Sequence, residues 1–346
     1  MDSAGPSRTS SWTYLALGLT LLSLTVSVLG AYVRLSHAGL SCPDWPGCYG
    51  QALVPGSEVE IENANAAYPQ RPVDVPRAWK EMVHRYLAGL LGLGVLVLAV
   101  WSLRRRHHPY QPRVVPWVLL GLVMFQAALG MWTVTLLLKP LIVMGHLLGG
   151  FTTVALLAWV TLRSGRMGVR RERPYGRSAL PWIVAGVVVL YAQISLGGWT
   201  GANYAALACP DFPLCQGQLV PPLDLSEALR PWRGIGQSYE GGVLANDARV
   251  TIHLLHRAGA LITFFFLGAL GLMLAMRARG ALAAGGLVLA AGVTLQALLG
   301  IGNVVLGLPI GVAVAHNGIA ASLLVALLVL WHLVSPPTPR PNYAAR

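Results

Sequence analysis

Eight apolar stretches, each long enough to cross a membrane, recur along the chain and limit its fold more than any other feature. They lie at residues 12–33, 82–102, 115–137, 141–162, 180–200, 252–276, 281–304 and 310–332. A membrane-spanning helix needs about 20 predominantly apolar residues. Charged residues make up 11% of the 346-residue chain, under half of the roughly 25% that is usual in soluble domains. The sequence therefore predicts an all-α integral membrane protein with eight transmembrane helices, and it excludes a soluble enzyme, a disordered chain and a fibrous protein.

The formal net charge of +12 is concentrated in particular segments of the chain. With the N-terminus placed inside, the inner segments hold 15 basic and two acidic residues, whereas the outer segments hold ten basic and 11 acidic residues. Cytoplasmic loops of membrane proteins carry such an excess of Lys and Arg. We therefore expect both termini on the inner side and the two long loops, 34–80 and 201–250, on the outer side. The positive charge indicates topology and not a nucleic-acid partner.

Four landmarks of the first half of the chain return in the same order in the second half. They are a cysteine-containing segment (42–51 and 209–218), a His-Arg pair (84–85 and 256–257), a Gln-Ala-x-Leu-Gly segment (126–130 and 296–300) and a later histidine (His146 and His316). Such self-similarity indicates a duplication. We predict two tandem pseudo-symmetric four-helix bundles, an N-terminal half at 1–165 and a C-terminal half at 166–346.

Four histidines are expected at one depth within the apolar stretches. They are His84, His146, His256 and His316, and each lies a few residues inside the outer end of its span. At 1.5 Å per residue, all four lie roughly 8–12 Å from that end. An ionisable residue inside a membrane is costly unless it is paired or bound. Two imidazoles on diagonal helices of a bundle suit the axial positions of a haem iron, so we predict a bis-histidine haem site in each half.

Two arginines and one acid accompany these histidines. Arg85 and Arg257 each follow a candidate ligand directly, so they are expected either to meet haem propionates or to reach the membrane interface. Glu81 precedes His84 by one helical turn, and His253 takes the equivalent place in the second half. A carboxylate beside only one of the two sites indicates acid–base chemistry in the first half, with a helix-capping acid as the alternative.

The four cysteines form two close pairs, Cys42 with Cys48 and Cys209 with Cys215, in the loops assigned to the outer side. That side is oxidising, so a disulfide within each loop is the simpler interpretation. A redox-active or substrate-attaching cysteine is the alternative. Neither pair has the Cys-x-x-Cys-His pattern of covalent haem attachment.

The duplicated four-helix halves, Glu-Met-Val-His-Arg at 81–85, His-Leu-Leu-His-Arg at 253–257 and the paired Cys-Pro-Asp loops together resemble the haem A synthase family over essentially the whole chain. The resemblance implies an oxidoreductase that converts the C8 methyl group of haem O into the formyl group of haem A. Haem A is the cofactor of terminal oxidases, so the implied role is in cytochrome oxidase assembly.

The resemblance also implies a role for each site residue. The ligand pair His256 and His316 would hold a resident haem b. The pair His84 and His146 would hold haem O as the substrate, with Glu81 as the catalytic acid. The family's loop cysteines fall on the four cysteines of this chain, and whether they share a mechanistic role is left open.

The implied setting is the bacterial cytoplasmic (inner) membrane. The expected partners are membrane lipid, haem O, the haem O synthase that supplies it and an unidentified electron donor. A b-type di-haem membrane electron carrier is the alternative function, and it explains the histidines but not Glu81. A transporter built from the same parallel repeats would bind its cargo near the midplane, whereas these polar residues are expected near the outer edge.

Overall fold

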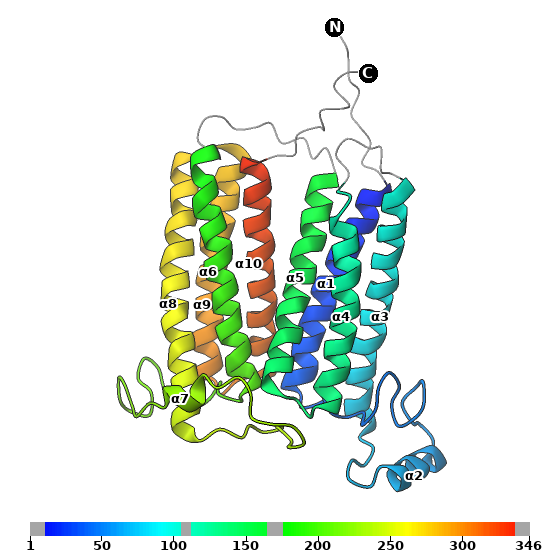
Figure 1. Ribbon diagram of the computed structural model, residues 1–346. Coiled ribbons are helices and arrows are strands. Elements are labelled where there is room, and N and C mark those ends of the chain that lie inside the picture. The colour runs from blue at the N-terminus through cyan, green and yellow to red at the C-terminus, as the bar shows by residue number, and fades with distance from the viewer. Residues whose placement is uncertain (1–10, 105–111, 165–175, 336–346) are drawn as a thin grey trace.

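The structure is a computed structural model that describes residues 11–104, 112–164 and 176–335. Within these ranges the chain is helical and contains no β-strand, as the sequence predicted (Figure 1). The helices there are α1 Ser11–Leu35, α2 Glu58–Ala67, α3 Val75–Arg104, α4 Val115–Thr135, α5 Pro140–Ser164, α6 Gly176–Ala202, α7 Leu225–Ala228, α8 Asn246–Arg277, α9 Gly280–Val305 and α10 Ile310–Val334. The predicted boundary between residues 165 and 166 lies outside the described residues.

Eight of these helices are long and apolar enough to cross a membrane, which confirms the predicted number of spans. Two of them begin six or more residues before their apolar stretches do, α3 at Val75 and α8 at Asn246. The 32 residues of α8 make a helix about 48 Å long at 1.5 Å per residue, whereas a hydrocarbon core is about 30 Å thick. Hydropathy does not register the polar first turns of these helices, and those turns face the outer loops.

The eight long helices form two closed rings of four. In the first helix ring, contacts run from α1 to α3, α4, α5 and back to α1. In the second helix ring, they run from α6 to α8, α9, α10 and back to α6. The two rings meet through α1, α5, α6 and α10 (Figure 1). The backbones of diagonally opposite helices, α3 with α5 and α8 with α10, stay farther apart than those of neighbouring helices within the described ranges. A symmetry axis that relates the rings stays a prediction.

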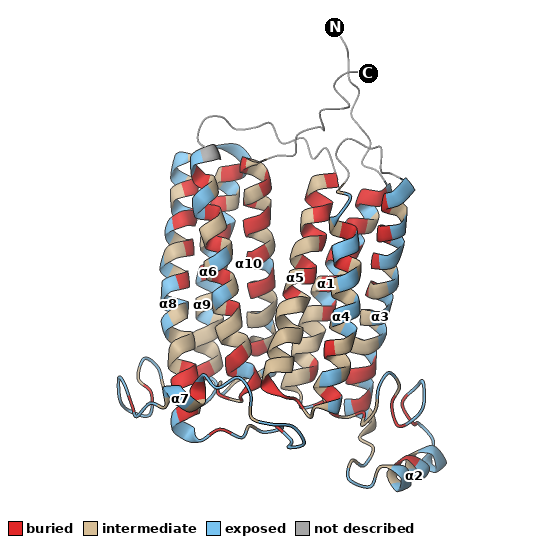
Figure 2. Ribbon diagram, in the orientation of Figure 1, coloured by how far each residue is buried: buried red, intermediate tan, exposed pale blue. Residues whose placement is uncertain are grey.

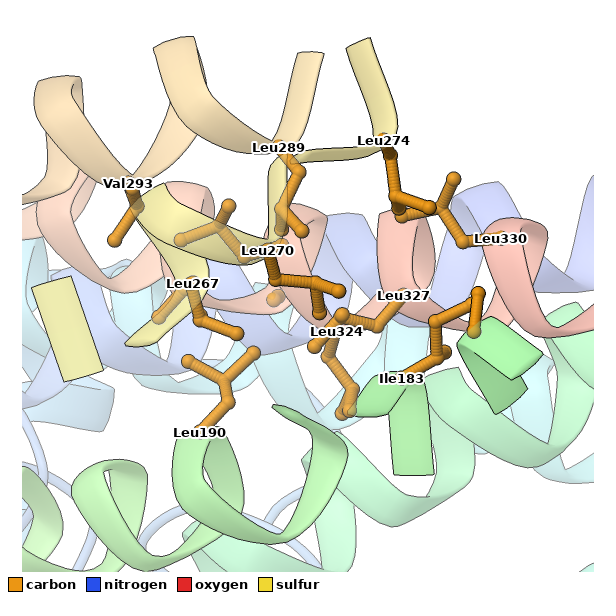
Figure 3. Close-up of a cluster of buried hydrophobic side chains, with 14 of the residues drawn as sticks. Ile183, Leu190, Leu267, Leu270, Leu274, Leu289, Val293, Leu324, Leu327 and Leu330 are labelled. Carbon is orange, nitrogen blue, oxygen red and sulfur yellow. The ribbon is translucent and has the colours of Figure 1, made fainter. Parts of the chain in front are cut away.

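The largest apolar core lies inside the second helix ring (Figure 3). Its labelled side chains come from all four helices of that ring: Ile183 and Leu190, Leu267, Leu270 and Leu274, Leu289 and Val293, and Leu324, Leu327 and Leu330. Figure 2 shows buried residues on the inward sides of the long helices and exposed residues on many outward faces. Apolar side chains that face outward suit contact with lipid.

Two glycines let the backbones of α8 and α9 touch beside this core. A Cβ atom built on Gly271 would lie 2.7 Å from the carbonyl oxygen of Gly286, and one built on Gly286 would lie 2.6 Å from the carbonyl oxygen of Gly271. Such distances leave no room for a side chain at either position. Small residues at helix interfaces allow this close approach in membranes, where packing replaces the hydrophobic driving force.

Both long loops lie at the same end of the helices, and each begins with a disulfide-closed turn (Figure 1). The disulfides join Cys42 to Cys48 and Cys209 to Cys215, which confirms the predicted pairing. The repeated aspartate of the motif closes each turn, since Asp211 accepts hydrogen bonds from the backbone N–H groups of residues 216 and 217, and Asp44 does the same for residues 49 and 50.

The turn requires glycine at its last tight position. Gly50 and Gly217 have φ angles of +75° and +74°, in the left-handed region that favours glycine. The hydrogen bond from the backbone N–H of Gly217 is the main reason why the pKa of Asp211 lies below its ordinary value. The repeated sequence therefore encodes one turn that is formed twice.

We expect Gly271→Ala to lower the thermal stability of the protein, because the new methyl group meets backbone atoms of α9 that cannot move independently. Overpacking of this kind typically costs about 1–3 kcal/mol. Gly268→Ala on the same helix is the matched control, because no atom lies within 4 Å of its built Cβ. Thermal unfolding of the two purified variants gives the comparison. Equal midpoints would contradict the close contact between α8 and α9.

Candidate functional site

Each candidate ligand histidine lies against a glycine of the preceding membrane span. A Cβ atom built on that glycine would come within 2.9–3.4 Å of Cε1 of the imidazole. The pairs are His84 on α3 with Gly30 on α1, His146 on α5 with Gly130 on α4, His256 on α8 with Gly197 on α6, and His316 on α10 with Gly300 on α9. The missing side chain lets each imidazole lie directly on the neighbouring helix.

These glycines were not among the predicted site residues, although their spacing carries a signal. Gly30 and Gly197 are 167 residues apart, the offset that separates the two cysteine segments. Gly130 and Gly300 are 170 residues apart, the offset that separates His146 from its counterpart. A search for glycines that share the offsets of the repeat would have found them.

The structure brings the predicted histidines together in pairs. His84 lies within electrostatic reach of His146, and His256 lies within electrostatic reach of His316. The members of each pair are on diagonally opposite helices, whose backbones stay apart within the described ranges. The imidazoles, like the apolar side chains of the buried clusters, extend into the space between these helices.

Several nitrogen and oxygen atoms around the pairs lack a hydrogen-bond partner. Nδ1 of His84, His146 and His316 makes no well-aligned hydrogen bond among the described residues, although the backbones of residues 26, 126 and 296 are close enough to interact with these imidazoles. Nε2 of His316 lies 3.2 Å from the side-chain nitrogen of Gln296. Nδ1 of His256 lies 3.0 Å from the side-chain nitrogen of Gln193. Buried polar atoms without partners are rare in proteins and costly. Imidazoles in this condition fit residues that coordinate a bound group.

A haem fits this set of donors better than a bare metal ion does. Within the described residues, no group of three or more His, Cys, Asp or Glu side chains is placed to hold a metal ion. The macrocycle of a haem supplies the equatorial ligands of its iron, so two imidazoles suffice as protein ligands. Two histidines on facing helices of each helix ring meet that requirement.

Glu81 ties α3 to the first disulfide loop. Its side chain is only 4% exposed, and its Oε2 accepts hydrogen bonds from the backbone N–H groups of Ser41, at 2.9 Å, and Cys42, at 3.0 Å. Its Oε1 accepts a hydrogen bond from the guanidinium of Arg85, one turn further along α3. The carboxylate, which lies one turn from His84, is thus held by three donors.

The two arginines predicted to lie near the haems hold the disulfide loops. Nη1 of Arg85 donates to the carbonyl oxygens of residues 44, 46 and 47. Arg257 donates to Asp211 at 2.7 Å, to Leu214 at 2.8 Å, to Cys209 at 3.2 Å and to Pro213 at 3.4 Å, in each case at the carbonyl oxygen. Contact between either arginine and a haem propionate stays a prediction.

His253 takes the place of Glu81 in the second half but makes a different contact. Its Nδ1 lies 2.9 Å from the carbonyl oxygen of Ala205, near the start of the second long loop. Since no carboxylate stands beside Arg257 on α8, both ends of that guanidinium bind loop carbonyls. The two halves thus fasten their loops with different residues, and only the first half has an acid there.

We expect Gly197→Val to reduce the amount of low-spin haem that the purified protein retains, because the new side chain pushes against the imidazole of His256. Gly201→Val on the same helix is the control, since nothing lies within 4 Å of its built Cβ. Absorption spectra of the two variants, normalised to protein, give the measurement. Equal haem content would show that the contact between Gly197 and His256 does not set the position of the imidazole.

Comparisons with known proteins show to which family the chain belongs. The sequence matches the family profile described as COX15-CtaA, cytochrome oxidase assembly protein, over residues 12–328. It is 45% identical to the haem A synthase of Shewanella oneidensis over 321 residues, which cover 91% of this chain and 96% of that relative. It is 28% identical to the haem A synthase of Mesorhizobium japonicum, with 96% of this chain and 92% of that relative covered. The chain belongs to the COX15-CtaA family of cytochrome oxidase assembly proteins.

Proposed function

We propose that this protein is a haem A synthase, which oxidises the C8 methyl group of haem O to the formyl group of haem A for cytochrome oxidase assembly. The observation that carries the proposal is the placement of two imidazoles in each helix ring, His84 with His146 and His256 with His316, each against a glycine of the neighbouring span. The relative that is named haem A synthase and shares 45% identity over most of both chains supports the same activity.

The residues around each pair have roles that follow from their chemistry. A bound haem supplies the iron redox chemistry that the side chains of this protein lack. The paired imidazoles would hold the haem, and the glycines behind them leave room for the imidazoles on the neighbouring helices. The surrounding apolar spans exclude water, which strengthens the electrostatic interactions inside the site.

We further propose a division of labour between the halves. Residues 1–165 would bind haem O as the substrate, and residues 166–346 would hold a resident haem b that passes electrons. The difference between Glu81 and His253 supports this division, because a carboxylate exchanges protons in a way that electron transfer alone does not need. Glu81 accepts two hydrogen bonds at Oε2 and one at Oε1, which leaves one acceptor site on Oε1 for a proton.

The proposed setting is the bacterial cytoplasmic membrane, with both termini in the cytoplasm and the cysteine loops outside. The placement of both disulfide loops at one end of the spans supports it, because disulfides persist on the oxidising side (Figure 1). Haem O would reach the protein from a haem O synthase in the same lipid membrane. A separate electron donor would reduce the resident haem.

We expect His256→Ala and His316→Ala each to abolish the low-spin b-type spectrum of the purified protein, because the iron loses one of its two axial protein ligands. His332→Ala is the matched control, since this histidine lies on α10 with His316 and is also buried, but far from the pair. Reduced-minus-oxidised difference spectra give the result. An unchanged low-spin signal in both ligand variants would refute the assignment of these residues.

We expect Glu81→Gln to stop formyl production while the b-type spectrum stays intact. Glutamine keeps the size of glutamate but cannot carry the proton, so the rate should fall about 10²–10⁴-fold. Haem O or its hydroxylated product should accumulate, as measured by chromatography of haem extracts from cells whose only copy carries the change. Haem A at wild-type levels would show that Glu81 only holds the loop.

The control for that experiment is Glu227→Gln, which removes a carboxylate that pairs with Arg230 and Arg233 in the other long loop. It should leave haem A levels unchanged. Alkylation under non-reducing conditions checks that the disulfide between Cys42 and Cys48 survives in the Glu81→Gln protein. Haem extracts of the wild-type strain also distinguish a haem A synthase from a di-haem electron carrier, because an electron carrier would yield no haem A.

A further inference from the structure

A cavity of about 350 Å³ lies at the outer end of the first helix ring. Its walls come from the first disulfide loop, from the segment that follows α2 and from the end of α4. The lining includes the apolar side chains of Leu40, Val134 and Leu137, the ring of Tyr68 and one charged side chain, Arg71. It is a largely apolar space with a single cation.

The cavity lies directly outward of the imidazoles of the first helix ring. Val134 is one turn from Gly130, on the same face of α4, which places it about 6 Å outward of the residue that faces His146. Cys42, which also lines the cavity, is held by Glu81, three residues and so about 4.5 Å outward of His84 on α3. The positions along α3 and along α4 thus agree that the cavity lies about one helical turn outward of the two imidazoles.

Arg71 forms only a long and exposed ion pair in the structure. Its Nη1 donates to the carbonyl oxygen of Leu40 at 3.1 Å, and its Nη2 lies 3.5 Å from the carboxylate of Glu240. The side chains of Arg71 and Glu240 are 30% and 42% exposed. An ion pair as long and as exposed as this one contributes little stability, so a better-placed anion would displace Glu240.

The carboxylate of Glu240 comes from the long loop of the other half. That loop is fastened to the first half beside the cavity, since the N–H of Tyr239 donates to the carbonyl oxygen of Leu137 at 3.0 Å. The buried ammonium of Lys139, 1% exposed, donates to the carbonyl oxygen of Gly234 and lies 3.0 Å from the centre of the Trp232 ring. The two halves therefore build this corner of the protein together.

We propose that the cavity receives a carboxylate-bearing edge of the tetrapyrrole substrate, with Arg71 as the positioning residue that binds the carboxylate in place of Glu240. The proposal rests on the proposed function, which puts that substrate between His84 and His146. The guanidinium of Arg85 is engaged by loop carbonyls and by Glu81, whereas Arg71, the charged residue of the cavity lining, has only a weak carboxylate partner. A macrocycle held by its iron presents its acid groups at its edge, and the apolar walls suit the adjoining ring carbons.

The test is a titration of the purified protein, with its resident haem in place, with iron protoporphyrin IX and with its dimethyl ester. Binding is followed by the change in the Soret band. We expect Arg71→Gln to weaken binding of the free acid about 10- to 100-fold, the effect of one charge-assisted hydrogen bond. Esterification should weaken binding to the wild type by a similar factor and should leave binding to Arg71→Gln unchanged.

Two further variants sharpen the result. Arg77→Gln removes a cation that pairs with Asp74 and does not line the cavity, so it should bind both forms as the wild type does. Glu240→Gln frees Arg71 and should tighten binding of the free acid severalfold. The proposal is overturned if the wild type binds acid and ester equally, or if Arg77→Gln weakens binding as much as Arg71→Gln. The His84→Ala variant tests the proposed function separately. If the added haem does not bind between His84 and His146, His84→Ala will give the same Soret change as the wild type.

Discussion

Each of the four candidate ligand imidazoles depends on a neighbouring backbone that carries no side chain. Glycine at positions 30, 130, 197 and 300 lets an imidazole lie on the adjacent helix. Within the described ranges the backbones of the diagonal helices of each ring stay apart, and the imidazoles and buried apolar side chains fill the space between them. Two imidazoles within apolar walls are an arrangement that fits a haem.

The outer loops are fastened to the same helices that carry the ligands. Arg85 and Arg257 follow their histidines directly, and their guanidinium groups hold the two disulfide-closed turns. Glu81 adds a second fastening in the first half. The position of the imidazoles and the position of the loops are therefore coupled, and a change in either is expected to reach the other. This coupling gives the repeated Cys-Pro-Asp segments a structural role that holds whatever their redox behaviour.

The sequence predicted most of the fold because its signals are local. Long apolar stretches give the number of spans, and two close cysteine pairs, each within one loop, give the disulfides. The early start of α8 at Asn246 was missed because its first turns are polar. The glycines behind the imidazoles were missed because glycine is frequent in membrane helices and also serves close helix packing, as at Gly271 and Gly286. The contact of Lys139 with Trp232 was not predicted, because it joins residues far apart in the chain and follows no periodic pattern of the sequence.

The central claim is that each half holds one haem between two imidazoles. The most direct test is the number of haems bound per chain when the purified protein is loaded with excess haem, measured as the pyridine haemochrome against protein mass. Two low-spin haems per chain are predicted, with one remaining in His146→Ala. A wild-type protein that saturates with a single haem, or a His146→Ala protein that still binds two, would contradict the account.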